Sequence, residues 1–290
     1  MQGTGTTIVD IAANGTVHPF ASIDASTLQG QCPDGVGLTS ALVVLRTGWV
    51  IVGSLPTTDG TAATAQAGCL LVLNDQGEVV ETITNILING PWGMTALDLD
   101  ATANIFVTNV LNGTVAGNGS IVQGGTVVRI NTVQSPSAMP TVQSMTPIGN
   151  GCAERTDPAA LVIGPTGVAL AADGSLYVAD TLNNRIVSIG DAVNRSSSAL
   201  NGQTLSNAAV LSGPLGIAIR PNNGHILAVS GNDGMLVELT AGGQVVSTGM
   251  LDSQGTPPGA GTLFGVATGS AGLCFVNDGT NTLNLLANPL

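Results

Sequence analysis

The chain of 290 residues has a formal net charge of −12, with 43% hydrophobic residues but only 8% charged residues. It contains 40 glycines and no lysine, and all six of its basic residues are arginines. This composition excludes a long-helix protein and is too apolar for a disordered chain. The acidic charge argues against nucleic acid and anionic membrane surfaces as partners. No apolar run reaches the roughly 20 residues that a membrane-spanning helix needs.

The first predicted elements are two short strands within residues 6–22, separated by an Asn-Gly turn. Five segments with a common pattern follow along the chain. In this pattern an apolar run begins at or near a Gly-Pro-x-Gly start, an Asn-, Asp- or Gly-rich turn follows, and a second apolar run comes next. The five segments span residues 38–54, 90–114, 164–190, 213–239 and 261–286. Their recurrence indicates a repeat protein.

The aligned glycines of the repeat are Gly93, Gly167, Gly216 and Gly265, and Ala41 stands at the equivalent place in the first segment. The last two steps are 49 residues each, whereas the step from Gly93 to Gly167 is longer because it contains an insertion at residues 113–126 and 135–158. In the clearest segment we predict strands at 168–170, 176–179, 185–189 and near 208–211. Four strands per period of about 40–50 residues favour a β-propeller over a sandwich or a β-helix.

Residues 164–190, GPTGVALAADGSLYVADTLNNRIVSIG, resemble an NHL repeat in their Gly-Pro-x-Gly-Val-Ala, Asp-Gly-x-Leu-Tyr-Val-Ala-Asp and Asn-x-Arg-Ile elements. The looser segments extend the resemblance over about residues 38–286. The chain is also similar to uncharacterised exported bacterial NHL-repeat proteins. The resemblance implies an all-β, six-bladed β-propeller, which is usually a binding platform and has a few enzymes among its relatives.

We expect one domain over residues 1–290, with a partial blade at 1–25 and blades at about 38–84, 90–148, 164–212, 213–250 and 261–290. The first blade lacks two strands, so we expect the chain to start inside a blade and to leave a gap or an exposed edge near its N-terminus. Low charge and abundant Thr, Asn and Gly are typical of exported proteins. We therefore expect an extracellular or periplasmic protein whose signal peptide lies outside this chain.

The candidate site is one rim of the central channel, where each first strand begins beside the end of the second strand. Trp92 and Phe264 stand out there because aromatic residues are scarce, although both could equally plug the channel or pack between blades. Apolar walls with a few polar groups favour a small-molecule site. The candidate ligand-binding residues are Trp92, Thr166, Leu215, Phe264, Asn109, Asp180 and Asp278.

Asp180 and Asp278 also fit a structural role, in which the carboxylate caps the following turn and Asp180 faces Arg185. Asp180, Asp278 and Asn109 could supply oxygen ligands for Ca²⁺ at this rim. Because three residues are few for an ion that takes six to eight oxygens, we expect no metal and keep Ca²⁺ as an alternative. In the related gluconolactonase and regucalcin propellers, Glu and Asn or Asp hold a divalent ion. The residues at those places here are Trp92, Thr166, Leu215 and Phe264, which counts against lactonase chemistry.

The histidines and cysteines do not indicate a catalytic or zinc site. We predict His225 at the opposite rim and His18 in an N-terminal strand, both at the surface, so neither can serve as a general base at the site. Cys32, Cys69 and Cys152 lie in loop-like segments, where one disulfide is possible but its pairing cannot be read from the sequence, and Cys274 is predicted to be a buried core thiol.

Two functions fit these observations. The first is a binding platform for a small molecule or a protein on one propeller face, without nucleic acid or membrane insertion and as a monomer. The alternative is an enzyme, such as a lyase, a lactonase-like hydrolase or an isomerase, that uses an apolar channel pocket. A protein-binding scaffold would show an exposed apolar patch on one face, for example at 113–126.

Overall fold

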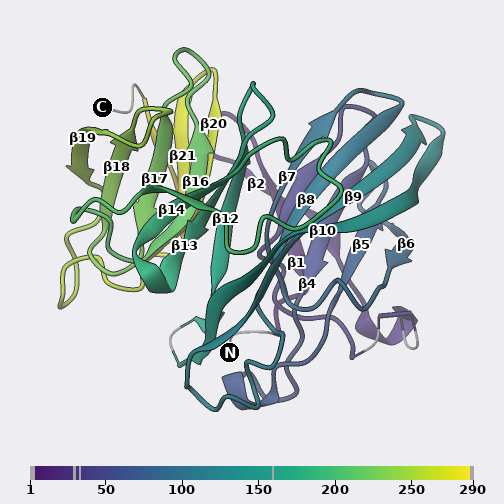
Figure 1. Ribbon diagram of the computed structural model, residues 1–290. Helices are drawn as coiled ribbons and strands as arrows, with labels where there is room; N and C mark the ends of the chain where they lie inside the picture. The colour runs from purple at the N-terminus through teal and green to yellow at the C-terminus, as the bar shows by residue number, and fades with distance from the viewer. Residues whose placement is uncertain (1–3, 29–30, 33, 159, 288–290) are drawn as a thin grey trace.

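The computed structural model describes residues 4–28, 31–32, 34–158 and 160–287, and it is an all-β structure (Figure 1). Its helices are single 3₁₀ turns, η1 (Ala25–Leu28), η2 (Ala62–Thr64) and η3 (Thr181–Asn183). Among the described residues no helix is long and apolar enough to cross a membrane.

Five antiparallel sheets follow one another along the chain and surround a central channel. The first sheet contains β3 (Leu42–Val44), β4 (Val50–Ser54), β5 (Cys69–Leu73) and β6 (Val79–Ile83). The second contains β7 (Pro91–Asp98), β8 (Thr102–Asn109), β9 (Val122–Ser135), β10 (Ala138–Asp157) and β11 (Leu161–Ile163). The third contains β12 (Pro165–Leu170), β13 (Leu176–Asp180), β14 (Arg185–Ile189) and β15 (Gln203–Ser206). The fourth contains β16 (Pro214–Ile219), β17 (Ile226–Ser230), β18 (Met235–Leu239) and β19 (Val245–Met250). The fifth contains β20 (Leu263–Gly269), β21 (Gly272–Asn277) and β22 (Thr282–Leu286).

The expected six blades are corrected to five. The strands β1 (Thr7–Ile11) and β2 (Val17–Ser22) pair only with each other, as a separate two-stranded sheet, among the described residues. They pack against one face of the first sheet, where Ile8 and Ala21 join Val52, Leu71 and Leu73 in one apolar cluster. The hairpin is therefore a cover for the first blade. Residues 1–3 and 288–290 of the expected terminal blades lie outside the described residues.

The aligned glycines explain how neighbouring blades meet. A β-carbon at Gly93 would overlap the carbonyl oxygen of Thr166, one at Gly167 that of Leu215, and one at Gly216 that of Phe264. None of these glycines has a φ in the left-handed region, so it is the closeness of the next backbone that requires glycine. A β-carbon at Gly265, by contrast, would have a methyl group of Val276 in the same sheet as its nearest neighbour, at 3.8 Å. The ring of closely packed inner strands thus ends at the fifth sheet.

The core consists of apolar layers between consecutive sheets. Leu45, Ile51 and Val72 of the first sheet region are packed with Ile105 and Ile130 of the second. Similar clusters join the second sheet to the third, the third to the fourth and the fourth to the fifth. Each strand alternates its side chains between the two faces, and both faces of the middle sheets are covered, which is why their strands are almost continuously apolar.

Two sequence expectations about strands differ from the structure. Much of the insertion is strand, because β9 and β10 form a long hairpin whose ladder is interrupted by several register shifts. Pro147 lies beside one of these shifts, where a missing N–H disrupts the ladder least. The fourth strand of the clearest repeat is β15, Gln203–Ser206, and it precedes the predicted position near residue 208.

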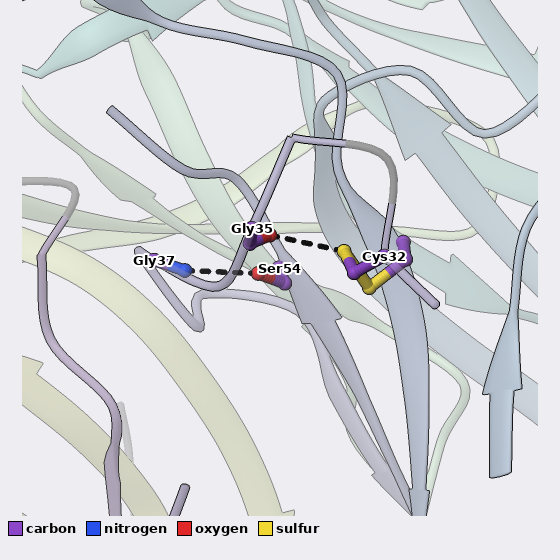
Figure 2. Close-up of a disulfide and its surroundings, with 5 residues drawn as sticks. Cys32, Gly35, Gly37 and Ser54 are labelled. Carbon is purple, nitrogen blue, oxygen red and sulfur yellow. Dashed lines mark hydrogen bonds between the residues drawn. A yellow bond between two sulfur atoms is a disulfide. The ribbon is translucent and has the colours of Figure 1, made fainter. Parts of the chain in front are cut away.

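The cysteines divide into one disulfide and two thiols. Cys32 is bonded to Cys69 of β5 and fastens the segment after η1 to the first sheet (Figure 2). Nearby, the N–H of Gly37 donates to the hydroxyl of Ser54 at 3.0 Å. Cys152 is buried, and that burial raises the pKa of its thiol to about 12. Cys274 is only half-buried, which corrects its expected place in the core.

Candidate functional site

A cavity of about 370 Å³ lies at the mouth of the channel, and the inner edge of all five sheets contributes to its wall. Its lining is mainly apolar and contains no ionisable side chain among the described residues. The lining residues are Thr39, Ser40, Leu42, Trp92, Gly93, Met94, Gly167, Val168, Leu215, Gly216, Ile217, Phe264, Gly265, Val266 and Val276.

A bulge at the aligned glycine shapes the wall of the cavity. The register of the first two strands shifts between Pro91 and Met94 in the second sheet and between Pro165 and Val168 in the third. The fourth and fifth sheets show the same shift, between Pro214 and Ile217 and between Leu263 and Val266. Such a bulge breaks the strict alternation of faces, so consecutive residues such as Trp92, Gly93 and Met94 can line one cavity.

Three of the candidate residues come together at this cavity. Trp92, Leu215 and Phe264 all line it, although Trp92 and Leu215 are largely buried. Trp92 also belongs to an apolar cluster with Val110, Leu111 and Leu161, against which Phe264 packs from the fifth sheet. The two aromatic rings therefore pack between blades, which is the structural role considered in the sequence analysis. They still leave an open volume beside them.

Four other candidates, Thr166, Asn109, Asp180 and Asp278, lie outside the lining of this cavity. The hydroxyl of Thr166 is 2.7 Å from that of Thr181 and 3.1 Å from the carbonyl oxygen of Leu215, so it is engaged between blades. Asn109 is fully buried, and its Oδ1 accepts the N–H of Asn89 at 2.9 Å. These side chains fix the ends of strands, and they do not face a ligand.

Asp180 forms a buried ion pair with Arg185 at 2.7 Å. Asn183 donates to both carboxylate oxygens, at 3.0 Å each. The expected contact with Arg185 is thus present, while the carboxylate does not cap the following turn through a backbone N–H. Asp180 serves to hold the turn between β13 and β14.

Asp278 lies in a different environment. It is exposed and borders a smaller cavity of about 190 Å³ beside the main one, together with Leu38, Ser40, Ala160 and Val276. Trp92 and Phe264 line both cavities. Asp278 is therefore the one candidate carboxylate that stands next to the open volume.

The residues of this rim do not fit a calcium ion. Calcium takes six to eight oxygen ligands. Asp180 is committed to Arg185 and Asn183, and Asn109 to Asn89. In the part of the chain that the structure describes, no three His, Cys, Asp or Glu side chains are grouped so that they could hold a metal.

Several lining residues escaped the sequence analysis although the repeat contains a signal for them. In the four repeats with an aligned glycine, the residue after that glycine is Met94, Val168, Ile217 and Val266, respectively. All four line the cavity. They are apolar in every repeat, which also suits a core position. Only the bulge in the first strand turns them toward the channel.

The carboxyl group with the most strongly raised pKa lies behind the rim. Glu154 of β10 is fully buried, and burial raises its pKa to about 7 despite hydrogen bonds from the Asn112 N–H and the Thr114 hydroxyl, both at 2.9 Å. Its second oxygen, Oε2, has no hydrogen-bond partner among the described residues. Glu154 anchors the loop that follows β8 and lines neither cavity at the channel mouth.

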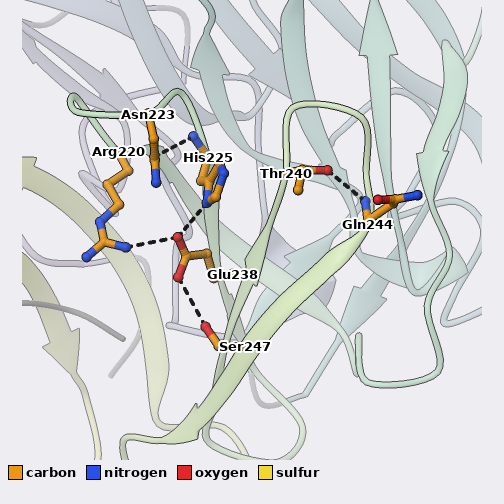
Figure 3. Close-up of polar contacts among 7 residues, drawn as sticks. All are labelled: Arg220, Asn223, His225, Glu238, Thr240, Gln244 and Ser247. Atoms are coloured by element: carbon orange, nitrogen blue, oxygen red, sulfur yellow. Dashed lines mark hydrogen bonds and ion pairs between the residues drawn. The ribbon is translucent and has the colours of Figure 1, made fainter.

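His225 lies in a polar network with Glu238 (Figure 3). Glu238 Oε1 accepts from Arg220 at 2.9 Å and lies 2.7 Å from His225 Nδ1, and Oε2 accepts from Ser247 at 3.1 Å. Burial acts to raise the pKa of Glu238, but these hydrogen bonds outweigh it and the pKa is lowered. Neither His225 nor Glu238 lines the two cavities at the channel mouth, so the network cannot act on a ligand there.

Comparisons with known proteins agree with the repeat and the fold. Residues 163–187 match the family model described as NHL repeat. No curated protein sequence matches the chain.

Three solved structures of similar fold have sequences that are distant from this chain. Virginiamycin B lyase from Staphylococcus aureus, in a structure with quinupristin, has 15% identity and a TM-score of 0.55 over 99% of this chain and 76% of the lyase. The calcium-binding protein regucalcin from Agrobacterium tumefaciens has 11% identity and a TM-score of 0.55, with coverage of 93% and 74%. A chain of a nidogen/laminin complex has 14% identity and a TM-score of 0.60, with coverage of 97% and 86%. At this level of identity the likeness shows the fold alone.

Proposed function

We propose that this chain, a β-propeller in which residues 163–187 match the NHL repeat, binds a small, uncharged and mainly apolar molecule at the mouth of its channel. The cavity of about 370 Å³, to which all five inner strands contribute, is the observation that carries the proposal. Its volume lies within the range of small-molecule sites, and its few hydroxyl groups, Thr39 and Ser40, would orient the ligand.

The charge of the ligand follows from the lining. A charged group placed in this cavity would lose water without gaining an opposite charge, because no ionisable residue lines it among the described residues. Trp92 and Phe264 offer large apolar surfaces, and such side chains dominate binding energies at protein sites. A neutral molecule with one or two hydrogen-bonding groups is therefore the best match.

The proposal can be tested with the neutral fluorescent dye 6-propionyl-2-dimethylaminonaphthalene. We expect the dye to bind with an increase in its emission, and Phe264→Ala to weaken binding by about 10-fold, or about 1.4 kcal/mol, because an aromatic wall is lost. Trp92 lines the cavity and is a donor for energy transfer to the bound dye, so Trp92→Phe should lower the transfer.

Trp49 supplies the matched control. Its indole N–H donates to the carbonyl oxygen of Ser135 at 2.8 Å, and it does not line the cavity. Trp49→Phe should leave the dye affinity nearly unchanged and should lower the energy transfer less than Trp92→Phe does. Dye binding that is insensitive to Phe264→Ala and Trp92→Phe would refute the proposed site.

Catalysis in the same cavity is the second candidate, and it is favoured by one observation. The Asp278 carboxylate and the Ser40 hydroxyl border the same small cavity next to Trp92. If the chain is a lyase, hydrolase or isomerase, Asp278→Asn should abolish turnover of a neutral cyclic ester or peptide while dye binding is retained. Equal turnover by this variant would exclude Asp278 from the chemistry.

Calcium is not part of the proposal, since the Asp180 carboxylate and the Asn109 Oδ1 are already engaged by protein donors. We expect the melting temperature to be the same, within error, in 5 mM CaCl₂ and in EDTA. An increase of several degrees with CaCl₂ would show that the folded protein binds the cation and would contradict this expectation.

Export remains part of the proposal. The disulfide between Cys32 and Cys69 supports it, because disulfides persist in the periplasm and outside the cell and are rare in reducing compartments. Expression with a periplasmic signal should give the oxidised form in higher yield than expression in a reducing cytosol.

A further inference from the structure

A second, larger cavity lies at the other end of the inner strands. Gly93 faces the carbonyl oxygen of Thr166 and Gly167 that of Leu215, so equivalent ends of the inner strands lie together. The cavity at the channel mouth is lined near the start of β7, β12 and β16, whereas the second cavity, of about 850 Å³, is lined farther along the same strands and by the turns beyond them.

The walls of this second cavity come from the second, third and fourth sheets alone. All its lining residues lie between residues 95 and 241, so neither end of the chain takes part. We call it the distal cavity, with Asp173, Tyr177, Asp191 and Arg220 among its lining residues. Its volume lies within the range of small-molecule sites.

The distal cavity differs from the cavity at the channel mouth in its charge. Asp173 and Asp191 supply two carboxylates to the lining, and Arg220 supplies one guanidinium. The guanidinium is engaged, because it forms an ion pair with the buried Glu238 at 2.9 Å (Figure 3). Neither Asp173 nor Asp191 forms an ion pair among the described residues. The cavity therefore presents uncompensated negative charge.

Each of the two carboxylates uses one oxygen to hold its own turn. Asp173 Oδ1 accepts the N–H of Ser175 at 2.9 Å, and Asp191 Oδ1 accepts from the side chain of Asn194 at 2.8 Å. Within the part of the chain that the structure describes, no hydrogen bond reaches the Oδ2 of either residue. Both residues are exposed. Each carboxylate is thus fixed in place and keeps one oxygen for a ligand.

An aromatic ring lies close to the first of these carboxylates. Tyr177, the single tyrosine of the chain, is 4% exposed and lines the distal cavity. Burial raises the pKa of its hydroxyl, and the negative charge of Asp173 raises it further. A cation beside Asp173 would therefore be attracted by the carboxylate and would lie near an aromatic ring, which also attracts cations.

The second carboxylate has a basic residue behind it. The buried guanidinium of Arg129 donates to the carbonyl oxygens of Ala192 and Val193, at 2.9 and 2.6 Å, and so holds the turn that carries Asp191. Burial lowers the pKa of Arg129, and the charge of Asp191 opposes that change. Since Arg129 in turn offsets part of the Asp191 charge, Asp173 is the stronger attraction for a cation.

We propose that the distal cavity binds a small organic cation, in which an ammonium group is carried on an apolar body. The ammonium group lies beside the two carboxylates, and the apolar body contacts Ala96, Leu170 and Ile219 of the lining. Because the carboxylates are exposed, the cation keeps part of its water and avoids the full cost of burying a charge. The two cavities share no lining residue, so this inference is independent of the proposed function.

Calorimetric titration with 4-phenylbutylamine, which carries an ammonium group at neutral pH, and with its neutral analogue 4-phenyl-1-butanol tests the proposal. We expect the amine to bind several-fold more tightly than the alcohol. Asp173→Asn should weaken amine binding by about 3- to 5-fold, the size of an ion pair that stays partly in water, and should not affect the alcohol. Asp191→Asn should have a smaller effect. Both variants keep an acceptor at Oδ1 for the turn, and circular dichroism will check their folding.

Two control variants separate this site from general attraction and from the other cavity. Asp75→Asn removes the same charge from an exposed position in the turn between β5 and β6, outside the distal cavity, and should leave amine affinity unchanged. Phe264→Ala should also leave it unchanged. Asp173→Asn should in turn leave the affinity for 6-propionyl-2-dimethylaminonaphthalene unchanged, so that either site can fail alone.

Nuclear magnetic resonance locates the bound amine. Its addition should shift the amide signals of Gly174 and Gly224, which line the distal cavity, more than those of Gly93 and Gly216 at the channel mouth. The proposal would be overturned by no binding of the amine, by equal affinity for amine and alcohol, or by equal effects of Asp173→Asn and Asp75→Asn. Larger shifts at Gly93 and Gly216 would overturn it as well.

Discussion

Gly93, Gly167 and Gly216 each stand where the next blade approaches most closely, whereas no backbone of the described residues approaches Gly265 at the same repeat position. This difference predicts unequal costs for one added methyl group. Gly216→Ala should lower the free energy of unfolding by about 1–3 kcal/mol, because the new β-carbon would overlap the backbone of Phe264. Gly265→Ala should change the free energy of unfolding by less than about 1 kcal/mol, since the new β-carbon would lie 3.8 Å from its nearest neighbour, a methyl group of Val276. Urea unfolding of both variants measures the contrast, and equal losses would show that the inner strands are not in the close contact described.

Glu154 predicts a specific dependence of stability on pH. Its pKa is raised from 4.5 to about 7 by burial, so the folded state favours the protonated acid. The stabilisation is therefore present below about pH 4.5 and is lost as the pH rises through 7, with a total of about 3 kcal/mol. In Glu154→Gln the side chain stays neutral and keeps an acceptor for Asn112 and Thr114, so this loss should disappear.

The measurement for Glu154 is the difference in unfolding free energy between Glu154→Gln and the parent protein at pH 5 and at pH 8. The variant should gain relative to the parent as the pH rises, and subtraction of the parent cancels the contributions of all other groups. A constant difference would mean that Glu154 titrates normally in the folded protein.

At the scale of elements, the β1–β2 hairpin covers the first sheet through apolar packing, and the Cys32–Cys69 disulfide attaches the segment after η1 to the same sheet. The disulfide closes a loop with a sequence separation of 37 residues, and restriction of the unfolded chain is worth about 4 kcal/mol for a loop of this length. Cys32→Ser combined with Cys69→Ser should lower the stability by about 2–4 kcal/mol. Differential scanning calorimetry with and without reductant checks this, and a melting temperature unaffected by both treatments would contradict it.

The sequence predicted most elements of the repeat and misjudged those that depend on long-range pairing. The first three strands of the clearest repeat match β12, β13 and β14, because Gly and Asn-rich turns mark their ends. β10 was described as part of an insertion, since its interrupted ladder and prolines weaken the alternation of a strand. Its pairing with β9 decides its structure, and that partner is not visible in the local sequence.

At the scale of the whole molecule, five blades follow one another from the first to the fifth sheet, and no further four-stranded blade follows Gly265 among the described residues. The repeats predicted a propeller, and the family model confirms the NHL repeat. The expected sixth blade is absent from the described residues because β1 and β2 pair only with each other. The number of strands in one repeat predicts that each repeat forms a blade. It does not predict which strands the terminal strands pair with, because that depends on the tertiary structure.

The sequence by itself determined that this is an acidic all-β repeat protein with glycines where blades meet, since composition, turns and period are local properties of the chain. Only the tertiary structure decided which rim residues face the open cavity. A bulge at each aligned glycine breaks the alternation of faces, so Trp92 and Phe264 line the cavity while the hydroxyl of Thr166, at the same repeat position, is engaged between blades. The direction of a side chain at a bulge depends on the register with its neighbour, and register is a property of paired strands.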